Sequence, residues 1–239
     1  MENTSLIALS RAVTLERQMA VVANNVANMN TTGFKSESPL FVEYLMRPNE
    51  DEHYSMVQDQ GTVRNIAPGP LQQTGNPLDM ALEGDGYFEL GTLDGPRYTR
   101  AGTFTMNADR VLVNIAGLPV MDETGNEITI PPNISEITVA PDGNIFTERG
   151  PLAKIGVFHF RNEQGLKPLG NGLLVTQEKP EVSENTLVRQ GFVEQSNVQS
   201  VVEMTSMISV SRQYEGIQKL LQAEHDRLRN AYTKLSRIA

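Results

Sequence analysis

The C-terminal segment carries an apolar repeat that constrains the fold of this chain more than any other feature. Between residues 207 and 238, apolar or aromatic side chains recur at alternating steps of three and four, with Glu224 as the exception. A repeat of about 3.5 residues places these side chains in one narrow seam along a helix, as in coiled coils. A helix over 198–238 would be about 60 Å long at about 1.5 Å per residue, so it needs a partner helix. The repeat comprises Met207, Val210, Tyr214, Ile217, Leu221, Leu228, Ala231, Leu235 and Ile238, and Val198, Val201, Met204 and Ile208 continue the stripe upstream in another register.

The N-terminal segment has the same spacing and supplies a candidate partner. Its apolar series is Ala8, Ala12, Leu15, Met19, Val22, Val26 and Met29. All 13 prolines, and every one of the 19 glycines except Gly33 and Gly216, lie between these two ends. Because proline and glycine interrupt helices, this distribution predicts a helix, an irregular and β-rich middle, and a second helix.

The predicted fold class is α+β. Long N- and C-terminal helices are expected to form a coiled-coil-like helical module, and the middle is expected to form an antiparallel β-rich domain. The spacing does not decide whether the helices run parallel or antiparallel. We expect the N-terminal helix of the helical module over 1–35, an extended connector over 36–75, the β-rich middle domain over 76–190 and the C-terminal helix over 191–239.

Turn signals in the middle of the chain separate short segments with alternating polarity. Asp94-Gly95-Pro96 lies between 87–90 and 97–100, and Asn107-Ala108-Asp109 lies between 103–106 and 111–113. Pro141-Asp142-Gly143-Asn144 lies between 134–139 and 145–147. Glycine, proline, asparagine and aspartate favour tight turns, so these segments predict antiparallel hairpins. Further strands are expected over 153–160 and 173–175.

The start of the C-terminal helix carries a capping signal. Ser196-Asn197-Val198-Gln199 has the residues of a capping box, with serine at the N-cap and glutamine at the third helical position. The sequence therefore predicts that the helix begins at about residue 197. Gly216 inside this helix is either tolerated, at a cost of about 1 kcal/mol relative to alanine, or marks a close helix crossing.

Charge and composition exclude several classes of protein. The net charge is −9, and residues 36–211 carry 11 basic and 24 acidic groups. This acidic body argues against binding to nucleic acid, which needs clustered lysine and arginine. No apolar run approaches 18 residues, so no membrane-spanning segment is predicted, and no secretory signal peptide is recognisable. The usual inference from the missing signal would be a cytosolic protein. The chain has no cysteine, which excludes disulfides and thiolate chemistry.

Residues for catalysis or cofactor binding do not form a recognisable pattern. His53, His159 and His225 are scattered, and none forms a pair at helical metal-ligand spacing. Asp85, Asp94 and Asp142 lie next to glycines but do not begin a calcium-binding loop. Dinucleotide, phosphate-loop and nucleophile-elbow motifs are also absent from the sequence. We therefore expect no enzyme, no metal and no cofactor.

Three asparagines stand at the end of the N-terminal helix. Asn24, Asn25 and Asn28 lie beside the apolar seam, although asparagine is a poor residue for a helix interior because its amide competes for backbone hydrogen bonds. One interpretation is that they fray and cap the helix, with Gly33 at positive φ. The other is that their amides bind neighbouring subunits of an assembly and fix its register.

These residues belong to a longer run that resembles a known family. Asn24-Asn25-Val26-Ala27-Asn28, followed by Asn30-Thr31 and Gly33-Phe34-Lys35, is similar to the N-terminal signature of bacterial flagellar rod and hook proteins. Ser196-Asn197-Val198, Glu203-Met204-Thr205, Met207-Ile208, Arg212 and Tyr214-Glu215 resemble its C-terminal segment. Residues 83–88 and 98–104, Glu-Gly-Asp-Gly-Tyr-Phe and Tyr-Thr-Arg-Ala-Gly-Thr-Phe, resemble its middle-domain motifs.

The resemblance implies a structural subunit of the flagellar basal-body rod, the drive shaft that transmits torque from motor to hook. The length, the single middle domain and the start Leu6–Arg11 look most like the proximal rod member, with the distal rod member as the alternative. The implied partners are other rod proteins, copies of the same chain and the flagellar type III export apparatus. Export through that apparatus, without a cleaved signal peptide, would place the chain in the periplasmic part of the basal body.

The terminal helices would then polymerise into an inner tube, with the β domain outside. The expected subunit-interface residues are Leu15, Met19, Val22, Asn24, Asn25, Val26, Asn28, Asn30, Gly33, Phe34, Asn197, Val198, Met204, Met207, Ile208, Tyr214, Ile217, Leu221, Leu228 and Leu235. A competing hypothesis from another class is a soluble cytosolic adaptor whose helices pair within one chain and whose β domain binds a ligand. Helices paired inside a monomer would favour this adaptor.

Overall fold

The computed structural model describes residues 2–49, 52–132, 134, 136–183 and 185–236. The chain divides into two compact units. The helix–hairpin unit consists of 1–27, 36–65 and 199–239, and the β unit consists of 28–35 and 66–198. Both ends of the chain therefore contribute to one unit, and the chain passes between the units four times, after residues 27, 35, 65 and 198.

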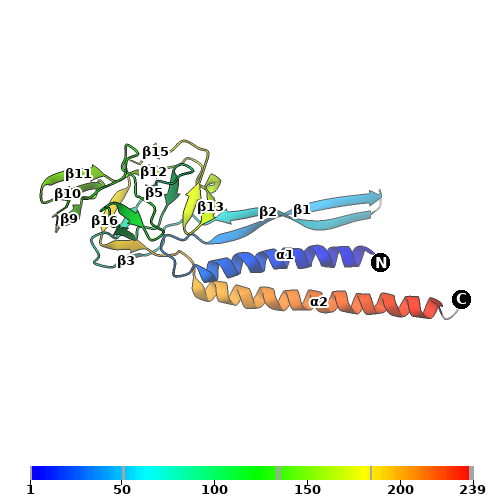
Figure 1. Ribbon diagram of the computed structural model, residues 1–239. Coiled ribbons are helices and arrows are strands. Elements are labelled where there is room, and N and C mark those ends of the chain that lie inside the picture. The colour runs from blue at the N-terminus through cyan, green and yellow to red at the C-terminus, as the bar shows by residue number, and fades with distance from the viewer. Residues whose placement is uncertain (1, 50–51, 133, 135, 184, 237–239) are drawn as a thin grey trace. The chain divides into compact units, whose positions relative to one another are not determined.

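The helix–hairpin unit is built around α1 (Glu2–Ala27), which packs against α2 (Ser200–Ser236). On its other side α1 contacts β1 (Glu37–Asn49) and β2 (Glu52–Arg64), which form an antiparallel hairpin. Figure 1 shows α1 lying between the hairpin and α2. This arrangement accounts for two stripes on α1. Ala8, Ala12, Leu15 and Val22 are buried along the predicted seam, and Thr14, Val21 and Asn25 are buried outside it.

The second stripe faces the hairpin. The Ser10 hydroxyl accepts a hydrogen bond from the backbone N–H of Val57 at 3.3 Å. Arg17 Nε forms an ion pair with the Asp59 carboxylate at 3.1 Å. Positions three and four apart lie on one helix face, so Thr14 and Val21 share the face that Ser10 and Arg17 define.

The prediction of a coiled-coil-like helical module was wrong. A two-helix coiled coil buries one narrow seam on each helix, whereas α1 is covered on two faces by two different elements. The helix–hairpin unit therefore consists of three packed layers, with α1 between α2 and the β1–β2 hairpin. The broader α+β layout, with helices at both ends and strands between them, was predicted correctly.

The two helices run antiparallel. Arg11 Nη2 donates to Gln213 Oε1 at 3.1 Å, and Asn25 Nδ2 donates to Glu203 Oε1 at 3.2 Å. These pairs place Glu2 opposite about residue 224, so the last turns of α2 extend beyond the first described residue of α1 by roughly 18 Å, at about 1.5 Å per residue. The C-terminal repeat therefore continues past the point at which α1 can cover it.

The hairpin lies in the stretch for which the sequence suggested an extended connector. Its register runs from Glu37 opposite Arg64 to Asn49 opposite Glu52. Pro39 is accommodated because a two-stranded ribbon has only edge strands, where a missing N–H donor is tolerated. A bulge follows Leu40, which pairs with Gly61, before Phe41 pairs with Asp59. Gly61 has φ of 119°, a backbone conformation that favours glycine.

The β unit contains short antiparallel strands and one turn of 3₁₀-helix. The strands are β3 (Leu71–Gln73), β4 (Met80–Glu83), β5 (Tyr87–Leu90), β6 (Arg97–Thr99), β7 (Phe104–Met106), β8 (Leu112–Asn114), β9 (Ile137–Val139), β10 (Asn144–Thr147), β11 (Gly150–Lys154), β12 (Val157–His159), β13 (Lys167–Gly170), β14 (Leu173–Val175), β15 (Glu181–Val182), β16 (Leu187–Gln190) and β17 (Phe192–Glu194), and the 3₁₀ turn is η1 (Glu163–Gly165). The largest sheet has the strand order β13-β14-β6-β5-β12-β15.

The hairpins predicted from turn signals are confirmed. β5 pairs with β6, β7 pairs with β8, and β9 pairs with β10, all antiparallel. The main core lies between these hairpins and includes Phe88, Phe104, Leu112 and Val120. The rings of Phe88 and Phe104 meet edge to face with centroids 5.1 Å apart, a favourable arrangement for an aromatic pair.

A second, aromatic cluster joins Tyr87, Tyr98, Phe158, Phe160 and Leu166. Tyr98 and Phe160 meet edge to face with ring centroids 4.8 Å apart. The Tyr87 hydroxyl donates to Glu163 Oε2 at 2.9 Å, so η1 is tied to the start of β5.

The capping box predicted for the C-terminal helix does not form. α2 begins at Ser200, and the Ser196 hydroxyl accepts a hydrogen bond from the N–H of Val198, two residues on, at 3.2 Å. This contact forms a local turn, and the four residues remain outside the helix. Gly33 has φ of 69°, as predicted.

Candidate assembly interface

The predicted interface residues fall into three groups. Leu15, Val22 and Asn25 are buried within the chain. The residues that are partly buried are Met19, Val26, Met207, Tyr214, Ile217 and Leu221 in the helix–hairpin unit, and Asn28, Gly33, Phe34, Asn197 and Val198 in the β unit. The exposed residues are Asn24, Asn30, Met204, Ile208 and Leu228. The side chain of Leu235 lies outside the described part of the chain. Exposed residues are the ones available to another subunit.

The structure adds exposed apolar residues that the seam analysis missed. On α1, Leu6, Leu9 and Val13 are 51%, 53% and 57% exposed. On α2, Val202 and Leu220, which lie outside the predicted stripes, are 55% and 48% exposed. Hairpin residues Leu40, Tyr44, Leu45 and Val57 are also exposed. Because leucine and valine recur on α1 at steps of three and four, a search for a second stripe on the N-terminal segment would have found them.

A groove of about 320 Å³ lies within the helix–hairpin unit. It is lined by Ile7, Ala8, Ser10 and Arg11 of α1, Ser55 and Val57 of β2, and Ile217 and Leu220 of α2. All three elements of the unit therefore contribute to one partly apolar surface. Large apolar surfaces that remain exposed commonly mark protein–protein contacts.

Asn25 joins the three elements of this unit. Its Nδ2 donates to the Glu37 carbonyl at 2.8 Å and to Glu203 Oε1 at 3.2 Å. The Glu37 N–H donates back to Asn25 Oδ1 at 2.9 Å. α1, the start of β1 and α2 therefore meet at one buried amide, which explains an asparagine near the end of a helix.

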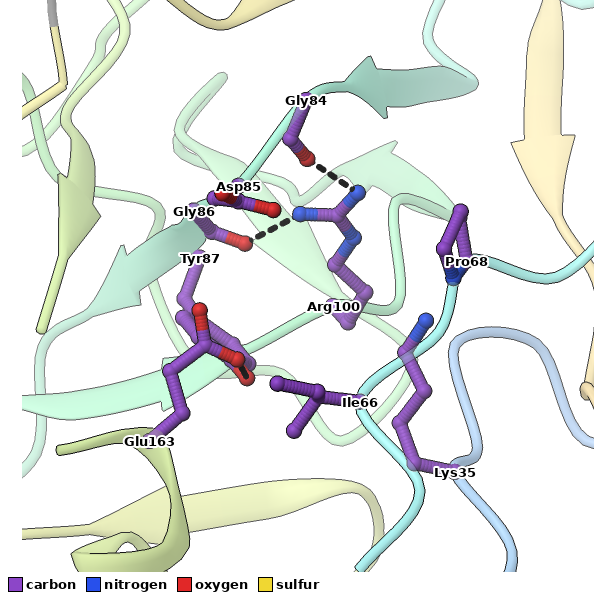
Figure 2. A pocket seen from close by; sticks show the side chains of 9 residues that line it. All are labelled: Lys35, Ile66, Pro68, Gly84, Asp85, Gly86, Tyr87, Arg100 and Glu163. Carbon is purple, nitrogen blue, oxygen red and sulfur yellow. Dashed lines mark hydrogen bonds between the residues drawn. The ribbon is translucent and has the colours of Figure 1, made fainter.

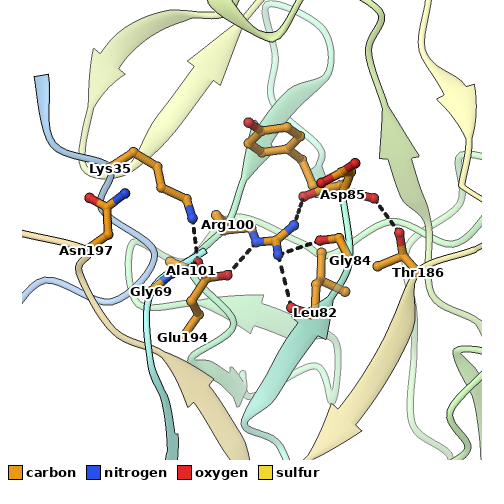
Figure 3. Close-up of polar contacts among 12 residues, drawn as sticks. Lys35, Gly69, Leu82, Gly84, Asp85, Arg100, Ala101, Thr186, Glu194 and Asn197 are labelled. Atoms are coloured by element: carbon orange, nitrogen blue, oxygen red, sulfur yellow. Dashed lines mark hydrogen bonds and ion pairs between the residues drawn. The ribbon is translucent and has the colours of Figure 1, made fainter. Parts of the chain in front are cut away.

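A buried ion cluster organises the β unit (Figure 3). Glu194 accepts from Lys35 Nζ and from Arg100 Nε, both at 2.5 Å. The Gly69 N–H donates to Glu194 Oε1 at 2.8 Å. The three charged side chains are 1–7% exposed. We call Lys35, Arg100 and Glu194 the ion clamp.

Arg100 connects the two middle-domain motifs noted in the sequence. Its Nη1 donates to the Gly86 carbonyl at 2.5 Å, and its Nη2 donates to the carbonyls of Leu82 and Gly84 at 3.0 and 2.7 Å. In Figure 2 the guanidinium points toward the Gly84 and Gly86 carbonyls. The second motif thus supplies the donors that hold the first motif's turn in place. Both motifs are structural.

The ion clamp shifts the pKa values of its own members. Burial alone would raise the pKa of the Glu194 carboxyl, but the charge of Arg100 and hydrogen bonds from Lys35, Arg100 and Gly69 outweigh burial and lower it. Burial also lowers the pKa of the Lys35 ammonium, although Glu194 opposes this shift.

A small pocket next to the ion clamp has a volume of about 70 Å³. Figure 2 shows its lining: Lys35, Ile66, Pro68, Gly84, Asp85, Gly86, Tyr87, Arg100 and Glu163. Typical small-molecule sites have volumes of roughly 300 Å³ or more, so this pocket is too small for an organic substrate. Within the described residues, no group of three or more histidine, cysteine, aspartate or glutamate side chains is placed to hold a metal. In the same part of the chain, no helix is both long and apolar enough to cross a membrane.

Three family models match the chain at its two ends and its middle. Residues 6–35 match the model described as flagella basal body rod protein. Residues 81–147 match the flagellar hook protein FlgE/F/G D1 domain. Residues 189–233 match the flagellar basal body rod FlgEFG protein C-terminal model. These ranges include most of α1, the three ion clamp residues and most of α2.

Curated relatives match over nearly the whole length. The flagellar basal-body rod protein FlgF of Caulobacter vibrioides is 35% identical over 100% of both chains. FlgF of Mesorhizobium japonicum is 35% identical over 92% of both chains. The flagellar basal-body rod protein FlgG of Agrobacterium fabrum is 33% identical over 86% of this chain and 89% of its own.

Proposed function

We propose that this chain, which belongs to the family of bacterial flagellar basal-body rod proteins and is a structural subunit of the rod, forms the proximal part of that rod. The observation that carries the proposal is the match to FlgF of Caulobacter vibrioides, at 35% identity over all of both chains. The match to FlgG of Agrobacterium fabrum omits part of each chain, so a distal position is the second candidate. The family is structural, and we propose no enzymatic activity.

Assembly is proposed to occur through the helix–hairpin unit. Its exposed residues Leu9 and Val13 on α1, and Val201 and Ile208 on α2, offer apolar contacts to neighbouring subunits. The last turns of α2 extend past α1 and leave Leu228 38% exposed. Contacts between different surfaces of like subunits, with a rotation that does not close a ring, produce a helical filament.

The same surfaces are suited to transmit torque. Apolar contacts dispersed along a helix of 37 residues share a twisting load among many small interactions. The buried amide of Asn25 holds both helices and the hairpin together within each subunit. Load that enters through one element therefore reaches the other two.

Internal pairing of α1 and α2 was expected to favour a soluble adaptor. It does not separate the two hypotheses. The helices pair inside one chain and still leave apolar residues exposed on both of them. Pairing fixes the shape of the subunit, and the exposed residues remain for assembly.

The chain is proposed to act in the periplasmic part of the flagellar basal body. Its partners there would be other rod proteins and copies of the same chain. Export would proceed through the flagellar type III apparatus without a cleaved signal peptide. A test is secretion of the tagged chain by cells that carry or lack a functional flagellar export apparatus. Secretion that persists without the apparatus would contradict this route.

The assembly step is tested with Ile208→Asp in cells that carry this chain in place of their own copy. The side chain is 55% exposed, so the purified variant should keep its helical circular dichroism and its unfolding midpoint. Incorporation into basal bodies and swimming should be lost, because a charge would be buried at the contact. The matched control is Lys219→Asp, which places the same charge at an exposed polar position of α2. Normal incorporation of Ile208→Asp would contradict the proposed interface.

The position in the rod is tested by cross-linking. The chain has no cysteine, so Val201→Cys provides a single reactive site at a residue that is 76% exposed. Cross-linked neighbours in purified basal bodies, identified by mass spectrometry, should be proximal rod proteins or copies of this chain. Cross-links to hook protein would favour the distal position.

A further inference from the structure

Three of the four passages of the chain between the two units, after residues 35, 65 and 198, lie within five residues of Lys35, Gly69 or Glu194. The β unit begins at residues 28–35, resumes at 66 and ends at 198. Lys35 is the last residue of the first segment, and Glu194 lies four residues before the end of the last. Gly69 follows closely after the third passage, at which the chain re-enters the β unit at residue 66. The clamp thus joins the segments through which any load must leave or enter the β unit.

Hydrogen bonds tie these segments to one another as well as to the clamp. The Gly33 N–H donates to the Glu194 carbonyl at 2.8 Å, and Lys35 Nζ donates to the Ala67 carbonyl at 2.9 Å. Asn197 Nδ2 donates to the same Ala67 carbonyl at 2.8 Å. The Asn197 N–H donates to the Phe34 carbonyl at 3.3 Å. Three segments that are remote in sequence are therefore joined by one network of hydrogen bonds.

We propose that Lys35 is a positioning residue that locks these segments together so that torque passes between the units without slack. The inference rests on the proposed function as a rod subunit. Lys35 is suited to this role because it is the last residue of one passage segment and its ammonium also donates to Ala67 in a second. Glu194 then connects Lys35 to Arg100, which is anchored in the β unit by three backbone carbonyls.

The charges favour a positioning role over a contribution to stability. The clamp holds two cations and one anion, so one positive charge is buried in excess. Buried ion pairs commonly add little to stability because desolvation offsets their attraction. Burial lowers the pKa of the Lys35 ammonium in keeping with this penalty. A lysine held here at such a cost is better explained by the segments that it joins.

Lys35→Met separates positioning from stability. Methionine is apolar and similar in length to lysine. Without the ammonium group, Glu194 is paired with Arg100 alone. No acceptor is orphaned, because Ala67 O keeps the bond from Asn197 Nδ2 and Glu194 Oε1 keeps the bond from the Gly69 N–H. The matched control is Lys154→Met, which removes a partly exposed ion pair with Glu123 in the same unit.

The first measurement is amide hydrogen exchange of the full-length purified chain. In Lys35→Met, exchange at Gly33 and Asn197 should accelerate at least tenfold, whereas exchange at the core amides Leu112 and Val120 should be unchanged. Lys154→Met should leave all four rates unchanged. Unchanged rates at Gly33 and Asn197 would overturn the proposal, as would an equal acceleration at all four amides, because either result assigns Lys35 no local positioning role.

The second measurement is swimming in media of increasing viscosity. Cells with Lys35→Met should incorporate the chain normally but lose speed under load at least twofold relative to Lys154→Met. Wild-type speed under load would overturn the link between the clamp and torque. Failure of the unaltered chain to enter basal bodies would instead contradict the proposed function itself, so the two failures are distinguishable.

Discussion

Asn25 and Glu37 are joined by two hydrogen bonds between one side-chain amide and one backbone unit. Asn25 Nδ2 donates to the Glu37 carbonyl at 2.8 Å, and the Glu37 N–H donates to Asn25 Oδ1 at 2.9 Å. The amide thus pairs with the backbone of the first residue of β1 in the way that a neighbouring strand would. Only a side chain with a donor and an acceptor at its end, at this length, can do so. This pair turns the end of α1 into the starting point of the hairpin.

Asn25→Asp should destabilise the helix–hairpin unit by about 2 kcal/mol, because the Glu37 carbonyl loses its donor and a carboxylate faces Glu203. Urea unfolding followed by helical circular dichroism measures this change. Asn24→Asp introduces the same group at the exposed neighbouring position and should change stability by less than about 0.5 kcal/mol. Equal effects of the two substitutions would show that the paired amide is unimportant.

Glu194→Gln should destabilise the β unit by about 3–5 kcal/mol. The substitution leaves two buried cations, Lys35 and Arg100, without their anion, and an uncompensated buried charge is costly. The control is Glu83→Gln, which breaks a half-exposed pair with Arg189 and should cost no more than about 1 kcal/mol. Urea unfolding of the full-length chain, read from amide signals of the β unit, compares the two. A loss in Glu194→Gln no larger than in the control would contradict the role of Glu194.

The contribution of Glu194 should depend on pH. Its pKa in the folded chain lies below the ordinary value of 4.5, so the unfolded chain takes up the proton first as pH falls. The stabilisation is therefore fully present above 4.5 and is lost as pH falls through the lowered folded pKa. The difference in unfolding free energy between the unaltered chain and Glu194→Gln should shrink over that range. A difference that stays constant on acidification would contradict the lowered pKa.

Local signals predicted the β hairpins of the middle domain well. Asp94-Gly95-Pro96 joins β5 to β6, and residues 141–144 contain the turn between β9 and β10. Such turns are determined by residues that are adjacent in sequence. The β1–β2 hairpin was missed because it carries Pro39 and Pro48 and packs one side on α1. Its stability depends on that helix, which a local pattern does not show.

The contacts of Asn25 and of the ion clamp could not be predicted from the sequence, because the residues that meet there are distant in the chain. Asn25 was singled out because asparagine is unfavourable within a helix, yet its partner Glu203 lies 178 residues away. Lys35 and Glu194 are 159 residues apart. Contacts between residues that are so far apart in the sequence produce no periodic pattern in it. The family signature located Asn25 and Lys35, but only the fold shows that both bind within their own chain.

Two glycines that the sequence cannot rank should respond to alanine in opposite directions. A Cβ at Gly102 would lie 1.6 Å from the Met80 carbonyl oxygen, so the backbone of β4 would have to move. The Met80 N–H also donates to the Gly102 carbonyl at 2.9 Å, and this bond holds the two segments close together. Gly102→Ala should therefore destabilise the β unit by about 3 kcal/mol.

A Cβ at Gly216, in contrast, meets no atom within 4 Å, so within the described part of the chain no close helix crossing occurs at this position. Gly216→Ala should stabilise α2 by up to about 1 kcal/mol, because alanine has less conformational freedom in the unfolded chain. Thermal unfolding of the full-length variants measures both changes. If the isolated Gly216→Ala chain is more stable but fails to enter basal bodies, the glycine is needed where a neighbouring subunit approaches α2. Normal incorporation together with higher stability would show that the glycine is only tolerated.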